Sequence, residues 1–191
     1  MPLVLAGATS GSTTIQATDA VTQTITLPNN TGTVLTTAST FGGTGPAFSA
    51  YATSQTISSS TPTNITYTTE EFDTAGCFNN TGSTVTLNGL SVPAYAFCPN
   101  VAGYYSFTMV ANTELSTVPT RCFVMIAKNG VTNRVSENQS AAVGVFGGSI
   151  IYYLNGTSDY VNAQIFLVAT TPRYSGGFAT TRFQGVLVRA A

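Results

Sequence analysis

Few side chains in this sequence could carry out catalysis. The 191 residues contain seven Asp and Glu, six Lys and Arg, and no histidine, the side chain used most often as a general base. Glu70 and Glu71 are adjacent, so on a strand their carboxylates would point to opposite faces and could not act as a pair. Cys77 and Cys122 have no histidine that could activate a thiolate. We therefore predict that the chain is not an enzyme. No pattern in the sequence indicates the pair of carboxylates that a glycosidase uses.

The charge of the chain argues against several kinds of partner. Only 7% of the residues are charged, the net charge is −1, and no block of Lys or Arg occurs. Because a nucleic-acid-binding surface must neutralise phosphates, no nucleic acid is expected as a partner. No apolar run reaches the roughly 18 residues that span a bilayer, and residues 1–7 lack the features of a signal peptide, so neither a membrane nor export is expected. A surface of Thr, Ser, Asn and Gln suits a protein held in a dense assembly.

The cysteines do not form the pattern of a disulfide scaffold. Cys77, Cys98 and Cys122 make an odd number, whereas disulfide-rich domains have an even and denser set. Cys77 and Cys98 could close a loop, but we favour three small buried thiols.

The elements that position these side chains are strands throughout. Apolar and polar residues alternate with period two, and no stretch shows the 3.6-residue period of a helix. Residues 1–37 read as about four short strands, among them 21–27 and 32–36, with too few large side chains for a core. Residues 38–46 form a Gly- and Pro-rich linker. The first segment is therefore a candidate anchor or stalk, and the alternative is that it packs on its own domain.

Residues 47–191 contain the aromatic residues that could build a core. Turn signals such as Asn88-Gly89 and Asn129-Gly130 separate the apolar runs. The fold class expected is all-β, an antiparallel β-sandwich or jelly roll. The candidate strands are 47–53, 65–72, 83–90, 104–110, 122–128, 149–154, 160–169 and 181–189.

Six short motifs in order resemble those of the C1q-type domain, the jelly roll shared with the tumour-necrosis-factor fold. They cover about three quarters of the chain, and residues 79–97 stand between two of them as an insertion. The motifs are AFSA (47–50), EFD followed by GCF (71–73 and 76–78), CPNVAGYYSF (98–107), KNG (128–130), LNGTSDYV (154–161) and FQGVL (183–187).

The first segment resembles a different group of proteins. The stretches GSTTI (11–15), TITLP (24–28) and TGTVLTT (31–37) are similar to a segment that recurs in fibres and surface proteins of tailed bacteriophages. Together with a C1q-like head, they indicate a virion surface protein.

The resemblance to C1q-type domains implies a homotrimer around a threefold axis. Consistent with this, 104–110, 150–154 and 163–169 are apolar on both faces, and a subunit interface is the natural cover for a second apolar face. We predict Phe48, Tyr105, Phe107, Tyr153 and Phe183 near the axis; the alternative is that each belongs to the core of one chain.

The resemblance also raises the question of calcium, which some C1q-like relatives bind. Asp73 and Asp159 lie in turns where such ligands could gather, but calcium takes 6–8 oxygen ligands. Plain turn capping is therefore favoured for both, and no cofactor is expected.

The function expected is non-enzymatic and structural, at the virion surface. The chain would be a trimeric capsid decoration (cement) protein or short surface fibre, attached to the major capsid protein or another virion protein through residues 1–37. The alternative is a receptor-binding tip that holds a host-surface glycan, with Tyr174 in the loop 170–178 stacking on the sugar.

Overall fold

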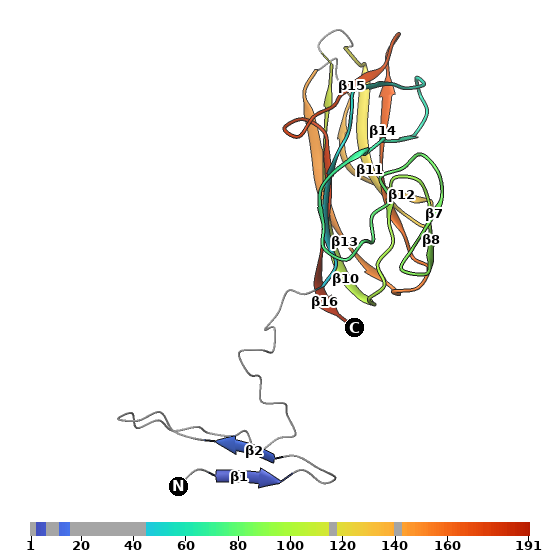
Figure 1. Ribbon diagram of the computed structural model, residues 1–191. Coiled ribbons are helices and arrows are strands. Elements are labelled where there is room, and N and C mark those ends of the chain that lie inside the picture. Colours follow the sequence, from blue (N-terminus) through green and yellow to red (C-terminus); the bar gives the residue numbers. More distant parts are fainter. Residues whose placement is uncertain (1–2, 7–11, 16–44, 115–117, 140–142) are drawn as a thin grey trace, which may run out of the picture. The chain divides into compact units, whose positions relative to one another are not determined.

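Strands make up the regular structure of this chain (Figure 1). The computed structural model describes residues 3–6, 12–15, 45–114, 118–139 and 143–191. Within these ranges every strand pairing is antiparallel, which confirms the fold class predicted from period-two alternation. In the same ranges, no helix suited to crossing a membrane occurs. The chain divides into two units, Met1–Phe41 and Gly42–Ala191, which are described separately.

In the first unit, the described residues form an antiparallel strand pair. β1 (Leu3–Ala6) pairs with β2 (Ser12–Ile15), so that Leu3 stands opposite Ile15. The strands predicted at 21–27 and 32–36, and most of the predicted linker, lie outside the described residues.

The second unit, called the head here, is built from two sheets. The large sheet has seven strands, in which β13, β10, β16, β3 and β6 lie side by side and β15 and β4 continue from one end of β10. Its strands are β3 (Ala47–Tyr51), β4 (Gln55–Thr56), β6 (Thr69–Asp73), β10 (Gly103–Thr113), β13 (Val145–Leu154), β15 (Arg173–Ser175) and β16 (Arg182–Ala190). The small sheet has five strands, namely β12 (Val131–Asn138), β11 (Arg121–Lys128), β14 (Val161–Val168), β5 (Thr63–Asn64) and β9 (Ala96–Phe97).

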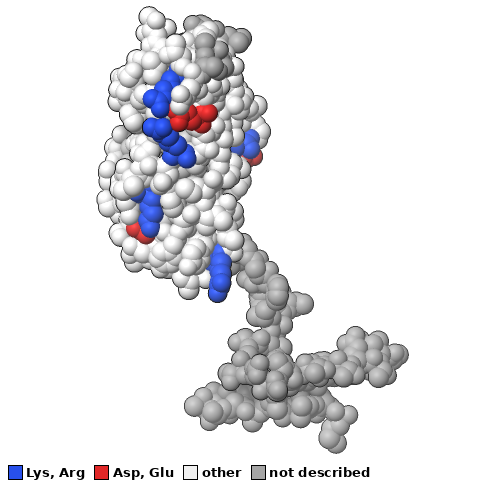
Figure 2. Space-filling view, turned by 180° about the vertical axis from the view of Figure 1, so that it is seen from behind, with Lys and Arg blue, Asp and Glu red and all other residues white. Residues whose placement is uncertain are grey.

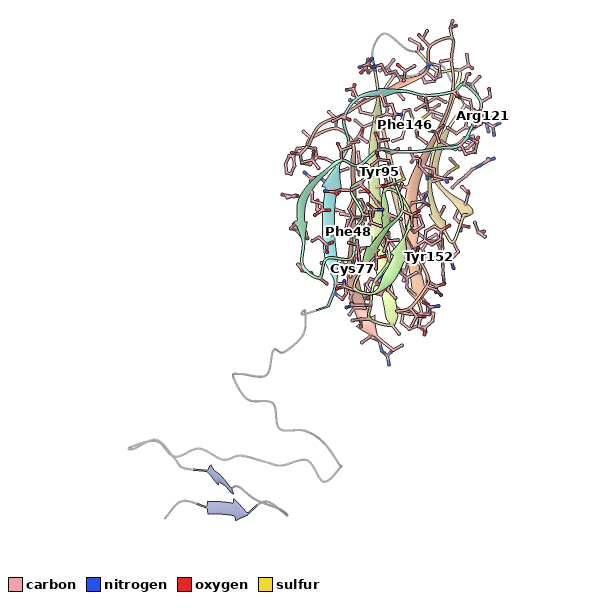
Figure 3. All side chains as sticks on the ribbon, turned by 45° about the vertical axis from the view of Figure 1, so that its right-hand side comes forward. Phe48, Cys77, Tyr95, Arg121, Phe146 and Tyr152 are labelled. Carbon is pink, nitrogen blue, oxygen red and sulfur yellow. The ribbon has the colours of Figure 1, made fainter. Side chains whose placement is uncertain are left out.

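The core between the sheets is rich in aromatic rings. Phe48 of β3 stacks on Phe78 and Phe97, with ring centroids 4.7 and 4.6 Å apart, and meets the Phe183 ring edge-on at 5.0 Å. Figure 3 shows Phe48 inside the head. Because each ring removes a large apolar area from water, these contacts supply much of the stability of the head.

Two predicted turns have the backbone that their sequences require. Asn88 and Gly89 have φ values of 50° and 78°, and Asn129 and Gly130 have 50° and 77°. Positive φ at both central residues is the mark of the tight hairpin turn that Asn-Gly favours. The first turn joins β7 (Val85–Leu87) to β8 (Leu90–Val92), and the second joins β11 to β12.

The strand β12 was not predicted from the sequence. Its residues, VTNRVSEN, are mostly polar, and none of the eight is buried: five are exposed, four of them at the start of the strand, and three are half-buried. β12 is an edge strand of the small sheet, held by its backbone pairing with β11. An edge strand needs little apolar sequence, so the alternation that marks the other strands is absent.

The insertion 79–97 folds as a small lobe with its own core. An antiparallel bridge between Phe78 and Phe97 closes its base. The Asn79 side chain is buried, and its amide nitrogen lies 2.8–3.0 Å from the carbonyl oxygens of Ser83, Val92 and Pro93. One buried amide therefore holds together three points of the lobe.

The three cysteines are buried free thiols, as predicted. Burial raises the pKa of Cys98 to about 11 and that of Cys122 to about 12, so neither is a thiolate near neutral pH.

Candidate assembly interface

The strand β10 divides its side chains cleanly between the core and the outer face of the large sheet. Tyr105, Phe107 and Met109 are fully buried between the sheets, whereas Tyr104 is 48% exposed. The residues that alternate with the buried ones, Ser106 and Thr108, face outward with Tyr104. The outer face of this strand is therefore mixed and uncharged.

The prediction of axis residues is wrong for four of the five. The side chains of Phe48, Tyr105, Phe107 and Phe183 are fully buried within the single chain, so they belong to its own core, which is the alternative given for each of them. Because these strands are apolar on both faces, their sequence alone does not separate the side chains of an interface from those of the core. In the structure these side chains fill the space between the two sheets, because only there can every face of a ring be covered.

Tyr153 lies on the outer face, as the prediction requires. It is 45% exposed, and its ring centroid lies 5.5 Å from that of Tyr104, its partner across the β10–β13 pairing. The Nζ atom of Lys128 lies 6.0 Å from the Tyr153 ring and donates a hydrogen bond of 2.7 Å to the Tyr153 carbonyl oxygen. Tyr104 of β10 and Tyr153 of β13 thus form an exposed pair of tyrosine rings on the outer face of the large sheet.

Two cross-strand rows continue this surface across the large sheet. The first places Ile151 and Val186 on either side of Ser106, and the two aliphatic side chains are 61% and 48% exposed. In the second, the Thr108 and Ser149 hydroxyls are 2.7 Å apart in a hydrogen bond. We call the outer surface of β10, β13 and β16 the assembly face. It combines exposed apolar side chains with neutral hydroxyl groups.

Two hollows open on the assembly face beside projecting rings. One of about 300 Å³ lies under Phe178, whose ring is 50% exposed, and one of about 220 Å³ lies beside Phe72, which is 46% exposed. The first is lined by Thr108, Val110, Phe178, Ala179, Thr180, Arg182 and Gln184, and the second by Ala47, Phe48, Phe72, Ser106, Thr108, Gln184, Gly185 and Val186. Projections next to hollows allow a second surface to interdigitate.

Charged side chains are sparse on the head. Figure 2 shows small groups of blue and red atoms on an otherwise white surface. On β16 the charges are Arg182 and Arg189, near the two ends of the strand, and the guanidinium carbon of Arg182 lies 3.8 Å from the centre of the Phe178 ring. A surface without repeated charge can be buried at low cost in desolvation.

Tyr174 cannot stack on a sugar as predicted. Its side chain is fully buried, and its hydroxyl lies 2.9–3.1 Å from Gln55 Oε1 and from the backbone nitrogen and Oγ1 of Thr66. The ring faces the core because β15 continues the large sheet and Tyr174 is its inward residue. The exposed ring of this loop is instead that of Phe178.

The turn-capping role predicted for Asp73 and Asp159 is confirmed. Asp73 accepts hydrogen bonds from the backbone N–H groups of Ala75 and Phe78 at 3.2 and 2.7 Å. Asp159 accepts from Asn155 N–H at 3.1 Å and from Asn129 Nδ2 at 2.6 Å. Among the residues that the structure describes, no group of three or more His, Cys, Asp or Glu is arranged to hold a metal ion.

Three further carboxylates of the head also make structural contacts. Glu71 Oε2 accepts a hydrogen bond of 2.9 Å from Ser49, and Glu114 Oε1 pairs with Arg173 Nε at 2.7 Å. Glu137 pairs with two arginines, described below. Asp19 lies outside the described residues.

Asp159 gives the head a specific pH dependence. Burial by itself raises the pKa of this carboxyl, but hydrogen bonds from Lys128, Asn129 and Asn155 outweigh it, so the pKa lies below its usual value. A depressed pKa stabilises the folded state above the unfolded pKa, and this contribution is lost as the pH falls through the folded pKa. We expect Asp159→Asn to destabilise the head by about 1–3 kcal/mol at pH 7. In urea unfolding between pH 3 and 7, the variant should lose less stability toward acid than the unchanged chain.

A matched control uses a carboxylate at the surface. Glu137→Gln removes ion pairs whose arginines are exposed, and it should change the free energy of unfolding less than Asp159→Asn at pH 7. Equal acid sensitivity of Asp159→Asn and the unchanged chain would contradict the prediction.

Solved structures share the fold of the head. The globular domain of zebrafish complement 1qA protein is 18% identical with a TM-score of 0.51, and the match covers 77% of this chain and 99% of that one. Murine APRIL is 10% identical with a TM-score of 0.52, over 75% and 99% of the two chains. The vertex protein P5 of PRD1 is 13% identical with a TM-score of 0.52, over 78% and 100%. No family model and no curated protein sequence matches the chain. At these identities the likeness concerns the fold alone, and it confirms the C1q-like jelly roll expected from the six motifs.

Proposed function

We propose that this chain is a homotrimeric, non-enzymatic structural protein of a bacteriophage virion. In this proposal it is a capsid decoration protein or a short surface fibre. Residues 1–37 attach to the coat protein or another virion protein, residues 38–46 link the two parts, and residues 47–191 form the projecting head. The observation that carries the proposal is the assembly face, which is exposed, largely uncharged and apolar at Tyr104, Ile151, Tyr153 and Val186.

The assembly face supports a trimer for a physical reason. Monomeric proteins rarely leave a continuous apolar surface in water, and such surfaces mark contacts with other proteins. Each copy carries both projections and hollows, so a copy can insert its Phe178 or Phe72 ring beside its neighbour. Contacts of this head-to-tail kind form a ring when the rotation between copies closes on itself, and the C1q-like resemblance implies a closed ring of three.

A virion position is supported by three features. The first segment resembles phage surface proteins, the head shares its fold with the vertex protein P5 of PRD1, and the charge content of 7% suits a dense assembly. Three attached arms would release slowly, because all three must detach together.

Two measurements test this proposal. Native mass spectrometry of the full chain at micromolar and nanomolar concentrations should show a trimer that survives dilution; a monomer at both would overturn the proposal. Immuno-electron microscopy of particles that carry the chain then locates it. Regular labelling over the shell supports a decoration protein, and labelling confined to the tail tip would favour the receptor-binding alternative.

A further inference from the structure

The outer face of the small sheet carries an aromatic pair flanked by two arginines. Phe123 of β11 and Phe166 of β14 stand opposite each other, and their rings stack 4.2 Å apart with an angle of 6° between their planes. The guanidinium carbons of Arg134 and Arg121 lie 4.3 and 5.2 Å from the centre of the Phe123 ring. Figure 3 places Arg121 at the outer margin of the head. Two of the six basic residues in the chain therefore contact the same aromatic ring, that of Phe123.

Glu137 fixes the positions of both guanidinium groups. Its Oε1 accepts hydrogen bonds from Arg121 Nε and Nη2 at 3.0 and 2.8 Å, and its Oε2 accepts one from Arg134 Nη1 at 3.0 Å. One carboxylate neutralises one of the two positive charges, so the group keeps a single net positive charge. The Arg121 and Arg134 side chains remain 40% and 53% exposed. Both are held in place by protein contacts and still accessible to a ligand.

A hollow of about 420 Å³ lies between this group and the loop that precedes β5. Its apolar floor includes Met125, which is 2% exposed, and the rings of Phe123 and Phe166. It is lined by Pro62, Arg121, Phe123, Met125, Thr132, Arg134 and Phe166. Apolar and aromatic walls with a few directed polar groups are typical of small-ligand sites, and the volume falls within their usual range of about 300–1,000 Å³.

We propose that this hollow binds a saccharide unit that carries one carboxylate, such as a uronic acid residue of an acidic glycan. The carboxylate accepts hydrogen bonds from the guanidinium N–H groups of Arg134 and Arg121 that Glu137 does not use, such as those on Arg121 Nη1 and Arg134 Nη2. The apolar face of the sugar ring packs against Phe166 and Pro62. The single net positive charge of this group matches the one carboxylate of the unit that occupies the hollow.

The strands below the hollow favour a sugar over an extended acidic peptide. β11, which carries Phe123 and Met125, is hydrogen-bonded to β12 on one side and to β14 on the other, so the backbone groups of the strand under the hollow are already paired. An extended peptide usually gains its affinity at a free sheet edge. The proposal goes beyond the structural role described above and does not depend on it, because the hollow lies on the small sheet and the assembly face on the large one.

The test titrates the full chain with three carboxylate-bearing saccharides and their neutral counterparts. These pairs are an oligogalacturonide and its methyl ester, a hyaluronan tetrasaccharide and the neutral N-acetylglucosamine tetramer tetraacetylchitotetraose, and sialyllactose and lactose. By NMR or calorimetry at low salt, at least one acid should bind saturably and about tenfold more tightly than its neutral partner, the size of one charge-assisted hydrogen bond. Added salt should weaken that binding.

Two variants locate the site. Arg134→Gln should weaken binding of the acid about tenfold while the thermal unfolding transition stays cooperative. Arg182→Gln is the matched control, because it removes an arginine stacked on Phe178 on the other sheet, and it should leave binding unchanged. Equal binding of acids and neutral partners, no saturable binding in the panel, or no effect of Arg134→Gln would overturn the proposal. Tighter binding of an Asp-rich peptide than of every saccharide would overturn the choice of ligand.

Discussion

Ile151→Glu should convert the proposed trimer to monomers. Ile151 is 61% exposed in the single chain and lies in the row of the assembly face that includes Ser106 and Val186. In a threefold assembly the substitution places three carboxylates in one interface, where they lose hydration and repel one another. We expect the dissociation constant of the trimer to rise by a factor of about 10³ or more, since an unpaired buried charge costs several kcal/mol. Native mass spectrometry at micromolar concentration should then show the monomer mass.

The matched control for this variant is Val131→Glu. Val131 is 68% exposed, similar to Ile151, but it belongs to β12 of the small sheet. It should leave the trimer intact. A trimer of Ile151→Glu that persists at nanomolar concentration would exclude this face as the interface, while dissociation of both variants would indicate an unspecific effect of added charge.

Gly185→Val should prevent the head from folding stably. A Cβ atom at Gly185 would lie 2.7 Å from two atoms of the Phe107 ring and 2.8 Å from the Phe48 ring. Both rings are fully buried, so neither can move aside without opening the core. We expect a loss of about 3 kcal/mol or more in the free energy of unfolding, from overpacking of the core and displaced rings. Urea unfolding followed by near-ultraviolet circular dichroism measures it.

Gly144→Val provides the control for backbone effects of the same substitution. No atom lies within 4 Å of a Cβ built at Gly144, and its φ is not in the positive region. Its free energy of unfolding should change by less than about 0.5 kcal/mol, as at most surface positions. If Gly185→Val were as stable as Gly144→Val, the described packing of Phe48 and Phe107 would be wrong.

Much of the fold of the head could be predicted from the sequence, because most of its strands have one face toward the core and the other toward the surface. Alternation with period two marked the core strands, and the Asn-Gly pairs marked the hairpin turns at Asn88 and Asn129 that the structure contains. The edge strand β12 was missed, since its backbone pairing with β11 leaves no requirement for apolar side chains.

The residues of the candidate sites could not be predicted in the same way. In a strand such as 104–110, apolar on both faces, the sequence does not say which set of side chains points to the core. Packing between the two sheets decides it, and it placed Tyr105 and Phe107 inside and Tyr104 outside. Packing between the sheets also explains why Tyr174, expected in a ligand-binding loop, is buried in the core.

The sequence by itself determined the class of the protein: all-β, weakly charged, without histidine, and with the motif order of a C1q-like head. The first three properties follow from local alternation and composition, and the motif order is a resemblance to C1q-type domains; none of them requires knowledge of distant contacts. Only the tertiary structure decided which surfaces are available. It brought Arg121, Arg134 and Glu137 together around Phe123 through pairing of strands β11 and β12, and it exposed Ile151 beside Val186 through pairing of both with β10. Contacts between residues far apart in the chain depend on strand register, which is set by packing of the whole head.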